Sequence, residues 1–442
     1  MEKNFTGRQV VALISVTLMG IVASVAFSIP LAIGFLPGLI TLIFLVRMKN
    51  HSFALIWQVG KAGISRAKTV IFILFFVGFL LPSWYEAGTI NQLVSLSLRM
   101  IIPSHFLLVS FLISSVFSMM LGTSVGTLSS IGIPIIGTAA ALHLPLDMVA
   151  GALISGAFVG DRTSPISSSH QLLSNIVEVE VKKQFQAMLV TSIAAVAAGC
   201  VFYWVLDTSL HPAKMIHTNS IMGRKGTDFV AFLPPAILIG AVLLRFKIIY
   251  AFMGSILTAC VVTFLNGISA MVLFKTLLFG VTGLGGGLKN MYLLLIFLAL
   301  AGIYNGLLEE YQVIQPLLDK WINSSSMLAM DTVKLVLATL GISMLSGNQT
   351  LPIILTGRSF LPHWSSKHGK EELARVMADS TMLFPAMIPW SVLAIMGSTI
   401  LGVSLYNYLP YAIFLWILPV LTIVISSFKQ VKTPSARVSK TG

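Results

Sequence analysis

The chain has 442 residues, of which 56% are hydrophobic and only 10% charged, and its mean hydropathy is +0.92. A soluble domain carries about 25% charged residues, so this composition excludes an ordinary soluble fold and predicts that lipid is the main solvent. The net charge of +13 does not indicate nucleic-acid binding, because membrane proteins concentrate Lys and Arg in cytoplasmic loops.

Apolar windows predict an all-α polytopic membrane protein with about 10–12 membrane segments, some of them half-length. The clear windows are, in chain order, residues 10–27, 31–46, 69–85, 104–121, 186–205, 229–244, 248–265, 290–307, 335–345 and 408–427. The intervals 122–175 and 346–402 are partly apolar but rich in Gly, Pro and hydroxyl residues. We expect re-entrant or broken helices there, because Gly and Pro interrupt the helical hydrogen-bond ladder.

The polar interval 206–228 divides the chain into two predicted membrane repeats, residues 1–205 and 229–428, followed by a tail, residues 429–442. The predicted loop 47–68 carries five basic residues and no acid, which places it in the cytoplasm. Two spans precede this loop and the tail is also basic, so both termini are expected to be cytoplasmic. The first two windows read as an uncleaved helical hairpin in a cell inner membrane.

The first broken stretch reads Gly122-Thr123-Ser124-Val125-Gly126-Thr127 and is followed, within the same predicted repeat, by Asp161. Residues 148–160 carry no charge, and Ser164 and Ser167 lie just beyond the aspartate. An ionised carboxylate at membrane depth costs several kcal/mol and usually faces a transport pathway. Asp161 is therefore the leading candidate for a functional acid.

The second repeat has the same order of features. Ser346-Gly347-Asn348-Gln349-Thr350 forms a broken stretch, and Asp379-Ser380-Thr381 follows it. Paired interrupted segments at matching places in two halves indicate the binding site of a secondary transporter.

Sodium prefers oxygen ligands, and a broken helix exposes carbonyl oxygens that the ladder otherwise uses. The predicted metal ligands are Asp161, Ser164 and Thr123. The wider predicted ion- or substrate-binding set adds Ser124, Thr127, Ser167, Asn348, Gln349, Asp379, Ser380 and Thr381. A carboxylate that accepts either Na+ or H+ predicts exchange of the two ions. No catalytic set and no cofactor, other than these transported ions, is expected.

Several alternatives stay open at this point. Ser and Thr hydroxyls in membrane helices often bond to the preceding turn, and small residues mediate helix packing. Arg375, one turn before Asp379, is a possible partner for it, and Arg162 is a candidate to neutralise Asp161, to bind an anion or to form a structural ion pair. The eight histidines look scattered and predict helix ends rather than a metal site. A channel remains a rival function, as does a membrane-embedded enzyme, although the nucleophile with a base, or the metal set, that an enzyme needs is not visible in the sequence.

At these motifs the chain resembles the NhaC family of Na+/H+ antiporters, including its malate/lactate-exchanging branch. The resembling pieces are residues 122–127, residues 151–167, which read GALISGAFVGDRTSPIS, and residues 379–391, which read DSTMLFPAMIPWS. The resemblance implies two inverted repeats with re-entrant hairpins, alternating access, and a bilayer, Na+ and H+ as partners. A homodimer is left open.

The chain departs from the family pattern at three places. Val125 stands where the family usually has Trp, Asn348 and Gln349 stand where an acid often occurs, and Ser168 and Ser169 stand where another Asp is usual. Fewer carboxylates therefore line the expected site. The alternative function is a sodium-coupled exchanger or symporter of a small organic carboxylate or amino acid.

Overall fold

The computed structural model describes residues 5–27, 29–93, 105–210, 229–244, 246–281, 286–316, 318 and 327–429. Apart from an isolated bridge at Val281, the regular structure of these residues is helical, as predicted. Most of the predicted connecting loop, residues 211–228, and all but the first residue of the predicted tail, residues 430–442, lie outside the described part.

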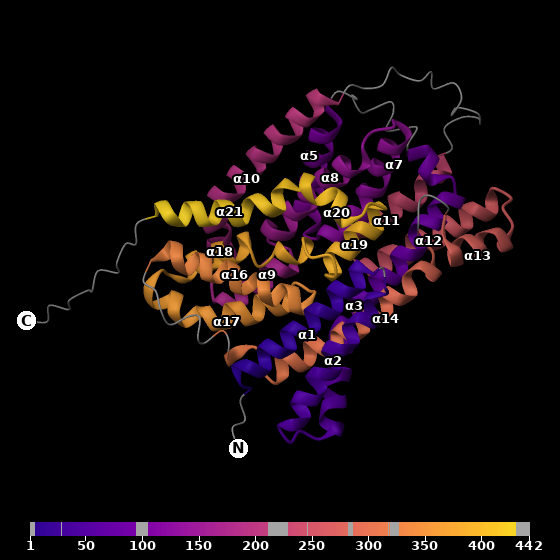
Figure 1. The fold of residues 1–442 in the computed structure, drawn as a ribbon. Helices are drawn as coiled ribbons and strands as arrows, with labels where there is room; N and C mark the ends of the chain where they lie inside the picture. Colours follow the sequence, from indigo (N-terminus) through magenta and orange to yellow (C-terminus); the bar gives the residue numbers. More distant parts are fainter. Residues whose placement is uncertain are drawn as a thin grey trace, which may run out of the picture.

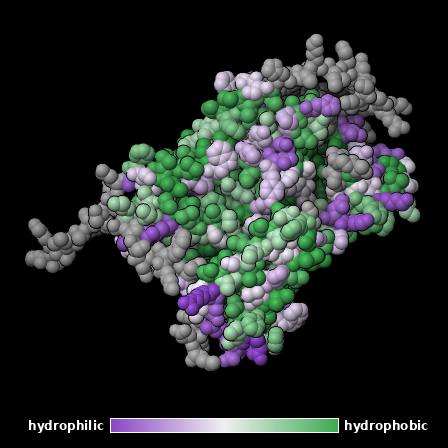
Figure 2. All heavy atoms as spheres, in the orientation of Figure 1, coloured by the Kyte–Doolittle hydropathy of each residue, from purple (hydrophilic) through white to green (hydrophobic). Residues whose placement is uncertain are grey.

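Seven described helices are long and apolar enough to cross a membrane: α1 (Gly7–Ala26), α2 (Leu31–Met48), α3 (Phe53–Glu86), α10 (Val181–Ser209), α12 (Ile248–Leu265), α14 (Leu288–Glu310) and α16 (Leu328–Ser346). An eighth span is a pair bent by 88°, α19 (Val392–Leu401) with α20 (Leu405–Tyr408) and η6 (Leu409–Tyr411). Large apolar side chains cover much of the face shown in Figure 2, as expected for a surface in lipid.

Shorter apolar helices complete the mixture of full and half-length segments that the sequence predicts. They are α5 (Phe106–Leu121), a run of α6 (Ser124–Thr127), η2 (Leu128–Gly132) and α7 (Ile133–Ala141), then η4 (Phe229–Phe232) with α11 (Leu233–Leu243), α13 (Ala270–Phe279) and α21 (Ile413–Phe428). The remaining helices are α8 (Leu146–Thr163), α9 (Ser168–Val177), α17 (Thr350–Lys367), α18 (Lys370–Asp379) and η5 (Phe384–Ala386).

One group of helices forms a scaffold around the long helices α3 and α14, which run side by side in Figure 1. The contact is close because glycines face each other: a Cβ on Gly63 would lie 2.2 Å from the carbonyl oxygen of Gly302. Helices α2, α12 and α13 pack against this pair, α1 packs on α2, and α11 packs on α12. Small residues at such crossings allow membrane helices to pack backbone against backbone.

The prediction of a loop over residues 47–68 is wrong. Helix α3 begins at Phe53, where the Ser52 side chain accepts a hydrogen bond from the Leu55 amide, 3.3 Å away. Its 34 residues extend about 51 Å at 1.5 Å per residue, which exceeds a hydrocarbon core of about 30 Å. The basic residues Lys61 and Arg66 therefore lie on a helix that can project beyond the bilayer.

The start of the predicted connecting loop is also helical. Helix α10 continues to Ser209, because the buried Asp207 carboxylate accepts hydrogen bonds from the amides of Leu107 and Leu108, each 3.0 Å away. These amides belong to the unpaired first turn of α5, so Asp207 caps one helix from another.

The second group, α5 to α10 with α16 to α21, forms a core in which helices break where the sequence predicts. Helix α5 ends at Gly122 (φ 65°) and α16 ends at Gly347 (φ 57°), both in the left-handed conformation that glycine adopts at little cost. Each break is followed by a helix, and later by a second break after Asp161 or Asp379. This matching order is compatible with the predicted repeats 1–205 and 229–428, and that division stays a prediction.

A buried ion pair joins the two halves within this core. Arg162 at the end of α8 donates to Asp379 at the end of α18, and both side chains are fully buried. Arg162 also donates to the Ala378 carbonyl at 3.2 Å and to the Thr191 hydroxyl at 3.0 Å. Arg375 lies 3.7 Å from the other oxygen of Asp379. The structural role, one of the alternatives left open for Arg162, is the one that the geometry shows.

Helices α5 and α8 pack most closely at Gly160, where an added Cβ would lie 2.0 Å from the carbonyl carbon of Ser118. Gly160→Ala is therefore expected to lower the free energy of unfolding by about 1–3 kcal/mol or more. Gly341→Ala is the matched control, because no atom lies within 4 Å of its Cβ position, and it should be neutral or stabilising. Thermal unfolding in detergent measures both; equal behaviour of the two variants would show that this crossing is not tight.

Asp379→Asn should destabilise the protein by about 3–5 kcal/mol, because it leaves the buried Arg162 without its counter-charge. Glu178→Gln removes an exposed pair with Lys370, 2.6 Å apart, and should cost less than about 1 kcal/mol. The same thermal unfolding assay compares them. A melting temperature for Asp379→Asn as high as that of Glu178→Gln would contradict a structural role for the buried pair.

Candidate functional site

Asp161 lies at the point where the broken segments of the two halves meet. It is 6% exposed and sits in the last turn of α8. One carboxylate oxygen, Oδ1, accepts from the backbone amide of Ser124, 3.2 Å away, and the Ser124 side chain also interacts with the carboxylate. The amide is available because α5 stops at Gly122 and the next helix starts at Ser124, with its first N–H groups unpaired.

The other carboxylate oxygen is held from the opposite half. Gln349 Nε2 donates to Asp161 Oδ2 at 3.2 Å and to the Met382 carbonyl at 2.7 Å. The Ser169 hydroxyl donates to Gln349 Oε1 at 2.5 Å, so the orientation of the amide is fixed. Gln349 thereby connects the first break, the second break and the segment after Asp379 in a single contact network.

Three predicted site residues support this arrangement without reaching the carboxylate oxygens. The Ser167 hydroxyl donates to the Asp161 carbonyl at 2.5 Å and also caps α9. The Ser164 hydroxyl donates to the Met119 carbonyl at 2.8 Å, and Thr123 caps α6 through the Gly126 amide. The structure thus brings Ser124 and Gln349 to Asp161, while Ser164 and Thr123 bond to backbone atoms.

The remaining predicted residues have other partners. Asn348 Oδ1 accepts from the Leu351 amide in the first turn of α17, 3.0 Å away, and Asp379 is paired with Arg162. The Thr127 and Ser380 hydroxyls bond to carbonyls of the preceding turn, as the packing alternative predicts. Thr381 is buried and its hydroxyl has no hydrogen-bond partner among the described residues.

A cavity of about 290 Å³ leads from the surface to this network. It lies between the scaffold helices α3 and α14 and the core, and Ser168, Ser169, Asn305, Asn348 and Gln349 line its polar part. Its outer part includes Arg66 and Glu309, which form a partly exposed salt bridge of 2.7 Å. Because Gln349 contacts Asp161 directly, the inner wall of the cavity is one side chain away from the carboxylate.

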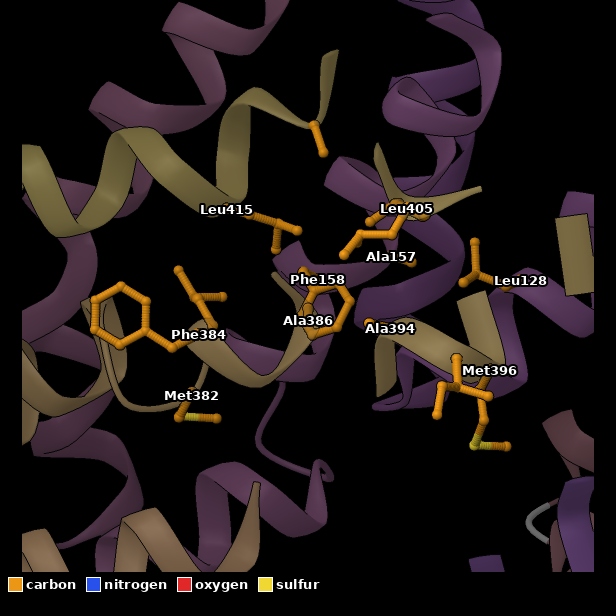
Figure 3. Packing of buried hydrophobic residues seen from close by; sticks show 14 of the residues in the cluster. Leu128, Ala157, Phe158, Met382, Phe384, Ala386, Ala394, Met396, Leu405 and Leu415 are labelled. Carbon is orange, nitrogen blue, oxygen red and sulfur yellow. The ribbon is translucent and has the colours of Figure 1, made fainter. Parts of the chain in front are cut away.

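The other side of Asp161 is closed by apolar packing. Figure 3 shows Phe158 beside Ala386, with Ala394, Leu405 and Leu415 around them. The cavity left between Ser124, Leu128, Phe158, Ala386 and Tyr408 holds about 10 Å³. That volume is at the lower limit of what a water molecule needs, so the contact seals this side. Asp161 can therefore be reached from the cavity on the Gln349 side, whereas the packing around Phe158 blocks access on the Ser124 side.

This arrangement suits a small cation. Two carboxylate oxygens and the Ser124 hydroxyl are the hard donors that Na+ prefers. No charged partner of Asp161 is present among the described residues, since the adjacent Arg162 points to Asp379. The carboxylate is therefore free to take up either Na+ or H+.

Sequence reasoning missed one cluster. The prediction that the histidines are scattered is wrong for His363 and His368, which both contact Asp331, at 2.8 Å and 2.9 Å. The two histidines belong to α17 and its end, while Asp331 lies 32 residues earlier in α16. Because Asp331 is more than 30 residues from either histidine, no local sequence motif indicates that the three side chains meet.

Comparisons with known proteins show the family of this chain. A family model described as the Na+/H+ antiporter family matches residues 156–429. The chain is 29% identical over 392 residues to the Na+/H+ antiporter NhaC of Bacillus subtilis, covering 83% of this chain and 86% of that protein.

Two further relatives have other names. The malate-2H+/Na+-lactate antiporter of Bacillus subtilis is 30% identical, covering 80% of this chain and 79% of its own length. The arginine/ornithine antiporter ArcD of Halobacterium salinarum is 25% identical, covering 81% and 78%. Since the family model spans more than half of the sequence, this chain is a multi-pass membrane transporter that belongs to the Na+/H+ antiporter family.

Proposed function

We propose that this protein exchanges Na+ for H+ across the membrane by alternating access, with Asp161 as the residue that binds both ions. The observation that carries the proposal is the position of Asp161. It is a buried carboxylate without a cationic partner among the described residues, held between the breaks of both halves. The similarity to NhaC antiporters supports the same function.

The exchange follows from competition for one negative group. Na+ entering through the cavity displaces the Gln349 amide donor from Asp161 Oδ2 and takes oxygen ligands from the carboxylate and neighbouring groups. A proton that binds to the carboxylate removes its charge and releases Na+. Because a bare carboxylate in this buried position is costly, the site favours being loaded with one ion or the other. Coupling of Na+ movement to H+ movement then needs no acidic residue other than Asp161.

We place the protein in the cell inner membrane with both termini in the cytoplasm. The basic residues Arg47, Lys49 and Lys61 lie around the turn between α2 and α3, which supports a cytoplasmic location for that end. Arg66, at the cavity mouth, belongs to the same end of α3. This conformation is then open to the cytoplasm, and separation of Phe158 from Ala386 would open the other side.

A second candidate function is sodium-coupled exchange or symport of a small organic carboxylate or amino acid. The cavity of about 290 Å³ is far larger than one Na+ requires and reaches the lower end of the size range of small-molecule sites. Arg66 and Glu309 offer one charge of each sign, which suits a carboxylate or a zwitterion. The names of the malate/lactate and arginine/ornithine relatives favour the same reading.

Asp161→Asn should abolish Na+-dependent proton movement, because the amide cannot alternate between a charged and a proton-loaded form. Proteoliposomes with an internal pH dye measure this after a Na+ gradient is imposed. Asp147→Asn, at the other end of the same helix, is the matched control and should retain exchange. Full exchange by Asp161→Asn, with a folded protein, would overturn the assignment of the site.

Gln349→Leu should lower the apparent KM for Na+ roughly tenfold or more, since Na+ no longer has to displace a hydrogen bond to a charged group, which is worth about 1.5–3 kcal/mol. The maximum rate should change less, because Asp161 remains in place. Gln171→Leu, which removes an exposed glutamine bonded to the Pro165 carbonyl at 3.0 Å, is the control. The same assay, run over a series of Na+ concentrations, reports both parameters. An unchanged KM would remove Gln349 from the ion pathway.

The two candidate functions differ in their dependence on an organic solute. Pure Na+/H+ exchange proceeds with inorganic ions alone. If proton movement appears only after malate, lactate, arginine or ornithine is added to one side, the second candidate is the function and the cavity holds the solute.

A further inference from the structure

A cluster of two imidazoles and one carboxylate lies at the far end of α17, away from the proposed ion site. Asp331 is in the first turn of α16, His363 is in the last turns of α17, and His368 ends that helix. His363 Nε2 lies 2.8 Å and His368 Nε2 2.9 Å from the same oxygen, Asp331 Oδ2. The side chains are 13%, 1% and 2% exposed for His363, His368 and Asp331.

The local fold explains why two histidines five positions apart face one point. His368 is the C-terminal cap of α17 with φ −123°, so the backbone leaves the helical path there. Its ring packs edge-on against Trp364, with ring centroids 5.2 Å apart and planes at 70°. A regular helix would turn residues five apart to different faces, and the irregular end of α17 corrects this difference.

The three ligand atoms, two ring nitrogens and one carboxylate oxygen, lie within 4.8 Å of one another, and the described residues hold no other such group. Two imidazoles with one carboxylate form a common ligand set for Zn2+, which takes three protein ligands plus water or four protein ligands. Nitrogen donors distinguish this cluster from the oxygen-rich surroundings of Asp161. We propose that Asp331, His363 and His368 form a binding site for a borderline divalent metal ion of the Zn2+ class.

Two hydrogen bonds hold the cluster together in the metal-free form. Both Nε2 atoms approach the same oxygen, so each must carry a proton in the metal-free form. A metal ion takes the place of these protons and binds the freed nitrogen lone pairs, and metal and protons compete for the site. The side chains need to move only slightly to bind the metal ion, because ligands of one Zn2+ lie about 2.0–2.2 Å from it and the three ligand atoms are already close together.

The position of the site gives it a structural role. Helix α17 has 18 residues, about 27 Å at 1.5 Å per residue, and begins next to Gln349. A metal ion at its end would fasten α17 to the start of α16. The same turn of α16 contacts α21 through the hydroxyls of Thr332 and Ser426, 3.0 Å apart. The metal would therefore fix three helix ends of the core while leaving Asp161 untouched.

Zn2+ binding to the purified, tag-free, full-length protein in detergent tests the proposal. Equilibrium dialysis followed by elemental analysis should give one Zn2+ per chain, and Zn2+ should raise the unfolding temperature. His363→Gln and, separately, Asp331→Asn should each weaken binding by at least the roughly 10- to 100-fold loss that follows removal of an outer-shell partner. His143→Gln, a change to an exposed histidine elsewhere, should bind Zn2+ like the parent protein.

Size-exclusion profiles of each variant without metal separate a folding defect from lost binding. His363 is the most exposed of the three ligands, so its variant has the best chance of folding normally. Absence of Zn2+ from the parent protein after dialysis would overturn the proposal. So would binding that persists unchanged in a folded His363→Gln variant.

Discussion

The whole arrangement depends on the cost of keeping one carboxylate, Asp161, away from water. An ionised acid in such a position must be compensated, and here a backbone amide from one half and a side-chain amide from the other do so, with no cationic side chain beside it in the part of the chain that the structure describes. A fixed positive partner would hold the charge permanently. Neutral donors stabilise the carboxylate only in part, so it stays available for a transported ion.

The breaks in the helices make this compensation possible. Gly122 and Gly347 end their helices in the left-handed conformation, and the next segments offer Ser124 and Gln349 to the same carboxylate. The second aspartate has a different role, since Asp379 is neutralised by Arg162. The two halves thus contribute unequal acids: Asp161 is the proposed ion-binding residue, and Asp379 is paired with Arg162 of the other half. The Arg162–Asp379 ion pair and the packed apolar contact between Phe158 and Ala386 both stabilise the core around the site (Figure 3).

Composition and apolar windows predicted the helical membrane fold, because lipid demands long uncharged helices. The predicted span 248–265 coincides with α12. Helices α5 and α16 end at Gly122 and Gly347, within the two stretches that the sequence predicts to be broken. Tertiary contacts decided the rest. The sequence did not show that Arg162 turns to Asp379 rather than to Asp161, that Ser164 bonds to Met119, or that α3 continues through a basic segment. Each of these depends on a residue far away in the chain or on exposure to water beyond the bilayer.

The most direct test of the shared site is the binding of Na+ to the purified protein, measured with radioactive Na+ while a pH indicator follows the weakly buffered solution. If Asp161 holds both ions in turn, Na+ binding releases protons, weakens as the pH falls, and disappears with its proton release in Asp161→Asn. Na+ binding that is independent of pH, or that survives in a folded Asp161→Asn variant, would contradict the account.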